Sequence, residues 1–376
     1  MLRISNLISS VLEDKRPREL NGNIIIWNFT NRCNLACKHC YSYADPNSKD
    51  ALSTEFILNS IGDLVKAGVK FVIFSGGEPL IRKDIFKIAD SMRKKGIVTY
   101  LSTNGLYISE KNVDRIIDTF NYIGISIDGI KEIHDNFRGL DGAFDKSIEA
   151  IKLIQKHGGN AGIRFTMTKE TQDSFYDIFK LAEDIGVDKL YLSHLVYSGR
   201  GLDNLKIDIT KEKRREFVNF IIDKAFEYYE TKRDIDIVTG NMEMDAIVLL
   251  EKFSEKYPEK RDELLQRLKN WGGNSAGVRL GNIDWEGRVK PDPFFPFFIG
   301  DMRERSFDEI WLDEDNEILK KLRKKPREIS GICADCKVLD ICNGGSRSRA
   351  YAISDGDLWS EDPSCYLSKE ERGVNG

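Results

Sequence analysis

The chain has 376 residues, more than one domain usually holds, so we expect one large domain and one small one. Hydrophobic residues make up 41% and charged residues 31%, which gives enough apolar material for a packed core and excludes a disordered chain. Lys and Arg total 57 against 61 Asp and Glu, and this net charge of −4 lacks the basic excess of a nucleic-acid-binding protein.

The first 22 residues contain charged side chains where a signal peptide would need its apolar core. No apolar run in the chain reaches the length of a transmembrane helix. We therefore expect a cytoplasmic protein with no membrane partner. The segment 1–22 is also too short for a separate domain that binds a leader peptide, which favours a small substrate.

From residue 23 to about 200, short β-branched runs alternate with longer amphipathic segments, as in βα units around a parallel sheet. The predicted strands are 23–29, 71–74, 97–101, 122–127, 161–166 and 189–193. The predicted helices are 53–67, 83–95, 109–119, 144–157 and 171–185. Six such units are two short of a closed barrel, so the predicted fold is α/β, an open partial (β/α)6 barrel over 23–205 with its chemistry at the carboxyl ends of the strands.

The remainder of the chain no longer shows the alternation of strands and helices. Residues 210–232 and 243–270 are predicted as two charged amphipathic helices without a strand between them, inside a connector spanning 206–275. A hairpin around Glu286-Gly287, a short helix near Ser306–Trp311 and a cysteine-rich tail follow. We predict that 276–376 forms a small C-terminal domain.

The seven cysteines fall into two groups, three within eight residues near the N-terminus and four between 333 and 365. A disulfide framework is not expected in a reducing compartment, and an odd number fits it even less well. Almost 300 residues without a cysteine separate the groups. Two separate metal sites are therefore predicted.

Cys33, Cys37 and Cys40 directly follow the first predicted strand. Thiolates are the natural ligands of iron–sulfur clusters, and three of them can bind three irons of a cube. The fourth iron then stays open to an amine and a carboxylate. A structural zinc site with a distant fourth ligand is the alternative.

The pattern C-x3-C-x2-C, with Gly76-Gly77-Glu78-Pro79 after the second strand, resembles the radical S-adenosylmethionine superfamily. The resemblance implies a 4Fe-4S cluster that reductively cleaves S-adenosylmethionine to a 5′-deoxyadenosyl radical, with the Gly-Gly-Glu-Pro stretch meeting the methionine amine. It also implies further cofactor contacts, near the adenine for His39, to the carboxylate for Arg164, and to the ribose or methionyl part for Ser102, Asn104, Ser126 and Asp128. Ordinary turns with Ser, Asn and Asp as caps would explain the last four equally well.

The tail contains Cys333, Cys336, Cys342 and Cys365, whose spacing resembles the auxiliary-cluster domains of the SPASM and twitch subfamilies. Four thiolates can close a second 4Fe-4S cluster, and they also make a good zinc site. Full SPASM domains have another cysteine set near the hairpin, which this chain lacks. One auxiliary cluster is therefore expected, and two clusters in total.

Stretches such as HDNFRG, HLVYSGRG and GDMRERSFDEIW resemble the haem-biosynthesis branch of the superfamily, which comprises NirJ-type enzymes and didecarboxysiroheme deacetylases. That resemblance implies removal or modification of carboxylate side chains on a siroheme-derived tetrapyrrole. It also implies reduced ferredoxin or flavodoxin as the electron donor.

Arginines suit a substrate that carries carboxylates, because guanidinium binds them in bidentate fashion. Arg164, Arg200, Arg279, Arg303 and Arg305 are available, and Arg200 is the preferred candidate. With His194 and Tyr197 it follows the sixth strand, where these three side chains could contact a polar substrate. A structural role for His194 is nearly as plausible.

Two positions depart from the haem branch. Lys290 and Met242 stand where its pattern has histidines, so another substrate is possible. Asp292 is retained and could neighbour a cluster or simply belong to the hairpin. The alternatives are a SPASM-type maturase of a ribosomal peptide or metal cofactor, and a non-enzymatic electron-transfer protein.

Overall fold

The computed structural model describes residues 1–15 and 22–373, and its strands form one eleven-stranded sheet. Six consecutive strands pair in parallel and in chain order, as predicted: β2 (Asn23–Asn28), β3 (Val69–Ser75), β4 (Val98–Thr103), β5 (Tyr122–Ser126), β6 (Ala161–Met167) and β7 (Lys189–His194). The predicted open α/β architecture is confirmed.

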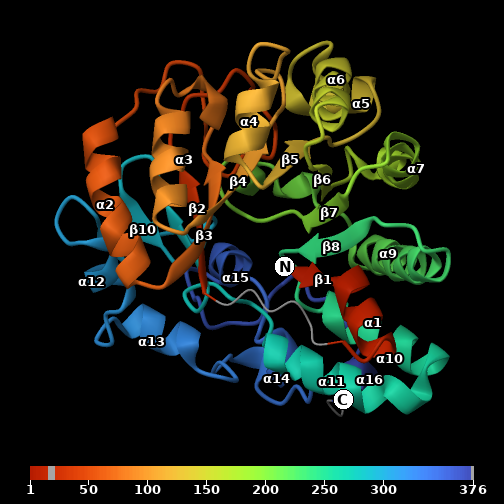
Figure 1. The fold of residues 1–376 in the computed structure, drawn as a ribbon. Coiled ribbons are helices and arrows are strands. Elements are labelled where there is room, and N and C mark those ends of the chain that lie inside the picture. Colours follow the sequence, from red (N-terminus) through yellow and green to blue (C-terminus); the bar gives the residue numbers. More distant parts are fainter. Residues whose placement is uncertain (16–21, 374–376) are drawn as a thin grey trace.

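The predicted helices between these strands are confirmed and lie along the outer face of the curved sheet (Figure 1). They are α2 (Thr54–Lys66), α3 (Ile85–Lys94), α4 (Val113–Thr119), α6 (Ala143–Lys156) and α7 (Phe175–Ile185). Ser53 begins α2 by accepting a hydrogen bond from the Phe56 amide. One further helix, α5 (Glu132–Arg138), was not predicted, because its seven residues are too few to show a periodic pattern.

The prediction of no strand between the two connector helices is wrong. β8 (Asp236–Gly240) lies between α9 (Lys211–Glu230) and α10 (Asp245–Lys256) and pairs in parallel with β7. Its Ile237 is fully buried, so sheet packing outweighs the polar neighbourhood of this short segment. The predicted helix 243–270 is also divided, because Pro258 opens a 3-10 turn before α11 (Arg261–Trp271).

Four short strands extend the two edges of the sheet. β1 (Leu2–Arg3) pairs antiparallel with β8, and α1 (Ile4–Leu12) follows it. On the other edge β9 (Leu280–Ile283) pairs in parallel with β2 and forms the predicted hairpin with β10 (Arg288–Lys290), which also pairs with β11 (Gly300–Asp301). Within the described residues β1 and β11 do not pair, so the barrel is open.

This one sheet runs across residues 205 and 275, where we predicted domain boundaries, and those boundaries remain a prediction. Residues 16–21 of the predicted N-terminal segment lie outside the described residues. In the described part of the chain, no helix is long and apolar enough to span a membrane.

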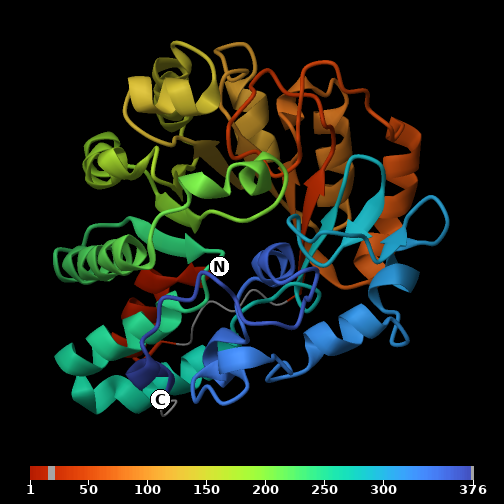
Figure 2. The ribbon, with the colours of Figure 1, turned by 180° about the vertical axis from the view of Figure 1, so that it is seen from behind.

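The C-terminal segment lies between the two ends of the sheet in both views (Figures 1 and 2). It begins with the predicted short helix, α12 (Phe307–Trp311), which Ser306 and Glu309 cap reciprocally. The other helices of this segment are α13 (Glu317–Arg323), α14 (Leu339–Cys342), α15 (Arg347–Ile353) and α16 (Lys369–Arg372). Earlier in the chain, the four-residue helix α8 (Arg200–Asp203) precedes α9.

Two glycines bring the end of β3 against the loop that follows β2. The amides of Gly77 and Glu78 each donate a 2.8 Å hydrogen bond, to the carbonyls of Thr30 and Arg32. A Cβ on Gly76 would lie 2.3 Å from the Thr30 oxygen, and one on Gly77 would lie 2.2 Å from the Arg32 oxygen. Since both obstacles are backbone atoms, only glycine permits this contact.

Replacing Gly77 by alanine should therefore force the two loops apart and lower the free energy of unfolding by about 1–3 kcal/mol. Denaturant unfolding under anaerobic conditions measures this change. Gly62→Ala is the matched control, because a Cβ there meets nothing within 4 Å inside α2 and the substitution favours the helix. Equal midpoints for the two variants would contradict the close-packing explanation.

Candidate active site

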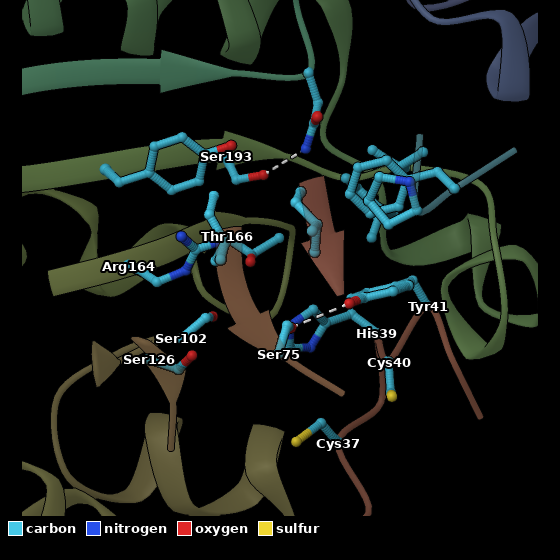
Figure 3. A pocket seen from close by; sticks show the side chains of 18 of the residues that line it. Cys37, His39, Cys40, Tyr41, Ser75, Ser102, Ser126, Arg164, Thr166 and Ser193 are labelled. Carbon is cyan, nitrogen blue, oxygen red and sulfur yellow. Dashed lines mark hydrogen bonds between the residues drawn. The ribbon is translucent and has the colours of Figure 1, made fainter. Parts of the chain in front are cut away.

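A cavity of about 230 Å³ lies at the carboxyl ends of the parallel strands. Side chains at the ends of five successive strands form its wall (Figure 3): Ser75, Ser102, Ser126, Thr166 and Ser193. Cys37 and Cys40 lie on one side of this space, opposite Ser193. The cavity thus has a cysteine end and a far end.

Cys33, Cys37 and Cys40 all line the cysteine end, and the first two are 7% exposed. The Leu35 amide lies 3.4 Å from Cys33 Sγ and donates a hydrogen bond to it. Burial raises the pKa of the Cys33 thiol to about 12, so a thiolate forms there only if positive charge compensates it. Two buried thiols and the half-buried thiol of Cys40 around open space fit the irons of a cluster.

Arg200 holds the loop that carries these cysteines. Its Nε donates to the Cys37 carbonyl at 2.7 Å and its Nη1 to the Ala44 carbonyl at 3.2 Å. Arg200 also lines the cavity, and two carbonyls of the cysteine loop engage its guanidinium.

The Gly-Gly-Glu-Pro stretch divides between the cavity and the interior. Gly76 and Gly77 line the cavity, whereas Glu78 and Pro79 are not on the described wall. Glu78 is fully buried and accepts hydrogen bonds from the Leu80 amide, the Thr103 hydroxyl and the Asn104 amide. Burial raises its pKa to about 7. Its carboxylate therefore links the ends of β3 and β4.

Two predicted cofactor residues belong to a buried charged group behind the cysteines. Asp128 is fully buried, accepts a 2.7 Å hydrogen bond from the Thr166 amide and forms an ion pair with Arg138. His39 lies beside it and stacks on Phe137 at 4.5 Å between ring centroids. Burial lowers the pKa of His39 to about 4, so its ring is neutral at pH 7. His39 lines the cavity, but Asp128 does not.

The remaining predicted residues separate in space. Ser102, Asn104, Ser126, Arg164 and His194 line the cavity, and Tyr197 does not. The Tyr197 hydroxyl instead donates to Asp208 at 2.6 Å. His194 is 1% exposed with its Nε2 3.2 Å from Asp245, and burial lowers its pKa. The structure thus brings His194 and Arg200 to one wall and leaves Tyr197 behind it.

Sequence reasoning missed an acidic residue of the cavity wall. Glu243 lines the cavity and is 5% exposed, with its Oε1 accepting from Asn274 and its Oε2 unpartnered among the described residues. Asp292 is 6% exposed and accepts a hydrogen bond from the Phe294 amide. Burial raises the pKa of Asp292 to about 6. A strand prediction at 236–240 would have placed Glu243 just beyond a strand end, which was the only available signal.

Other residues singled out in the sequence lie off the described wall. Met242 is 2% exposed, with its sulfur 3.8 Å from Arg349 Nη2. Arg303 and Arg305 form ion pairs with Asp301 and Asp313, and Arg279 and Lys290 also lie elsewhere.

A second cavity of about 160 Å³ brings together Cys333, Cys336, Cys342 and Cys365. All seven cysteines lie in the described part of the chain, and none forms a disulfide. Burial raises the pKa of Cys333 to about 11. Among the described residues, no three Cys, His, Asp or Glu side chains converge on one metal ion. A cluster needs no such convergence, because its ligands bind separate irons.

Buried arginines surround this second site. Arg327 and Arg347 are each 1% exposed, and their described hydrogen bonds go to carbonyl oxygens and to Asn274. Neither forms an ion pair with a carboxylate among the described residues. The charges that favour their cationic forms are first those of carboxylates, Glu243 and Asp292 for Arg327 and Asp362 for Arg347, and then those of thiols of the site. Two cations near the thiols suit a group of net negative charge, such as a cluster with four thiolates.

Arg349 connects the C-terminal segment to the main cavity. Its guanidinium pairs with Asp362, which lines the second cavity. It also donates to the carbonyls of Leu195 and Asn241, which follow β7 and β8 and line the main cavity.

Comparison with known proteins agrees with this geometry. Residues 27–182 match the radical SAM superfamily, and residues 277–337 match SPASM, an iron–sulfur cluster-binding domain. The chain is 37% identical to the pre-heme d1 synthase of Dinoroseobacter shibae over all of its own length and 94% of that protein. It is also 37% identical to the Fe-coproporphyrin III synthase of Methanosarcina barkeri, over 96% of the chain and 90% of the relative.

The fold is also similar to solved structures. Streptococcus suis SuiB bound to S-adenosylmethionine has a TM-score of 0.71 at 16% identity, covering 92% of this chain and 78% of that one. SPASM domains bind auxiliary iron–sulfur clusters, which favours a cluster over zinc at the second site. The enzyme relatives exclude a purely electron-transferring protein. This chain therefore belongs to the radical SAM superfamily, whose enzymes bind S-adenosylmethionine and a 4Fe-4S cluster, and it has a SPASM domain.

Proposed function

We propose that this enzyme cleaves S-adenosylmethionine at a cluster held by Cys33, Cys37 and Cys40. The resulting 5′-deoxyadenosyl radical removes or modifies carboxylate side chains of a siroheme-derived tetrapyrrole. One observation carries the proposal: a single cavity joins the three cysteines to a polar far end, so cofactor and substrate can meet in one enclosed space. Relatives named for haem d1 and coproporphyrin synthesis support the substrate class.

Residues of the cysteine end suit the cofactor. The cluster, when bound, supplies the electron for cleavage, and the protein positions the reactants. The neutral ring of His39, held flat on Phe137, offers a stacking surface for adenine. Ser102 and Ser126 bring hydroxyl groups to the same wall. Gly76 and Gly77 leave backbone, and no side chain, facing the space.

Arg164 is suited to a carboxylate, either of the methionyl group or of the substrate. Its guanidinium lies 4.7 Å from the centre of the Tyr191 ring and forms no hydrogen bond or ion pair with another described residue. Asp292, which also lines the cavity, has a raised pKa and can donate a hydrogen bond to a substrate carboxylate at mildly acidic pH. We further propose a cytoplasmic location and reduced ferredoxin or flavodoxin as donor.

The substrate is tested by anaerobic reconstitution with dithionite and S-adenosylmethionine, with and without didecarboxysiroheme. We expect the tetrapyrrole to raise the yield of 5′-deoxyadenosine and to lose mass equal to its acetate groups, both read by mass spectrometry. Cys40→Ala should form no 5′-deoxyadenosine. If the tetrapyrrole changes nothing, the tetrapyrrole assignment fails, and a SPASM-type maturation of a peptide or metal cofactor becomes the leading alternative.

The two-cluster arrangement is tested by counting iron. Cys33→Ala should lose about four iron atoms per chain together with cleavage of S-adenosylmethionine. Cys342→Ala should lose a similar amount of iron and keep the radical cluster, whose electron paramagnetic resonance signal shifts when S-adenosylmethionine binds. Loss of all iron in both variants would reject two independent sites.

A further inference from the structure

Arg138 is a buried cation in contact with the sulfur of a proposed cluster ligand. It ends α5, is 9% exposed, and its Nη1 lies 3.5 Å from Cys37 Sγ. Its Nη2 forms an ion pair with Asp128. The neighbouring Phe137 carbonyl accepts a 3.2 Å hydrogen bond from the Lys38 amide, so the end of α5 holds the cysteine loop through both backbone and side chain.

Hydrogen bonds to the sulfur and nearby charge are two of the ways in which a protein sets the reduction potential of an iron–sulfur cluster. The reduced cluster carries one more negative charge than the oxidised one. A guanidinium that donates to a ligand sulfur stabilises the reduced form more strongly, and burial from water strengthens this interaction.

We propose that Arg138 is a positioning residue that raises the reduction potential of the radical cluster, with Asp128 as the counter-charge that limits the increase. This inference rests on the proposed role of Cys37 as a ligand. It assigns Asp128 to the tuning of the cluster, in place of the predicted contact with the ribose or methionyl group.

The orientation of Asp128 supports this pairing. The Thr166 amide holds Oδ1 at 2.7 Å, and Oδ2 is left facing Arg138. Because Asp128 is fully buried, little water screens it. The two charges therefore act on the cluster with opposite signs, and neutralising each should move the potential in opposite directions. A purely structural pair would not produce that sign difference.

The test is a redox titration of the reconstituted full-length protein, followed by the signal that shifts on addition of S-adenosylmethionine. Arg138→Gln should lower the midpoint potential, with about a tenfold lower ratio of reduced to oxidised cluster at a fixed potential, or about 59 mV for one electron. Asp128→Asn should raise it. Arg138→Lys, which keeps the charge, should shift it less than Arg138→Gln.

Arg82→Gln is the matched control. Arg82 is also buried, pairs with Asp84 and donates to the backbone carbonyls of Phe29 and Leu52, but none of its hydrogen bonds reaches a cysteine. The midpoint potential of the Arg82→Gln variant should equal that of the wild type. The iron content should be equal in this variant and in the three variants at Arg138 and Asp128.

Shifts of the same sign for Arg138→Gln and Asp128→Asn, or no shift in either, would overturn the proposal. If Arg138→Gln fails to retain the cluster, the other two variants test the proposal. A higher midpoint potential in Asp128→Asn and a small shift in Arg138→Lys would support it, and their absence would overturn it. Cys37→Ala tests separately the assumption that Cys37 is a cluster ligand, because a variant that keeps all its iron would show that it is not.

Discussion

The structure depends on how the loop after β2 is held against the strand ends. Buried thiols can serve one cofactor only if the loop that presents them has a single position. Backbone hydrogen bonds from Gly77 and Glu78 hold it on one side, and the guanidinium of Arg200 holds it on the other. Most of these hydrogen bonds are accepted by backbone carbonyl oxygens. The position of the loop is therefore determined mainly by the path of its backbone and by the absence of side chains at Gly76 and Gly77.

The main cavity combines two chemically different surfaces. The cysteine end has serine hydroxyls, bare backbone and the guanidinium groups of Arg138 and Arg200, which neighbouring residues already engage, and this suits a cofactor with an amine, a carboxylate and a flat base. The cavity wall also contains two buried carboxyl groups, those of Glu243 and Asp292. Burial is the main cause of the raised pKa of Asp292, and the negative charge of Glu243 adds to it. Only Arg164 offers an uncommitted guanidinium among the described residues of the wall.

Much of this architecture followed from the sequence, because six strands with strong β-branched patterns alternate with capped helices. β8 was missed because its five residues are too few for a strand pattern to stand out between two charged helices. The cysteines and the glycines could be recognised because their motifs resemble those of the radical SAM superfamily. Arg138 could not, since its importance comes from α5 folding back onto Cys37, 101 positions earlier in the chain. Tyr197 failed to reach the cavity for the same reason: adjacency in sequence does not determine the direction of a side chain.

Arg349 links the two sites of the protein. A single guanidinium ties Asp362, beside the second cysteine group, to the loops that follow β7 and β8. Cys365 lies three residues after Asp362, so the last cysteine of the second site is close in the chain to the pair of Asp362 and Arg349. The second cysteine site and the wall of the main cavity therefore share one support, a single side chain that contacts both.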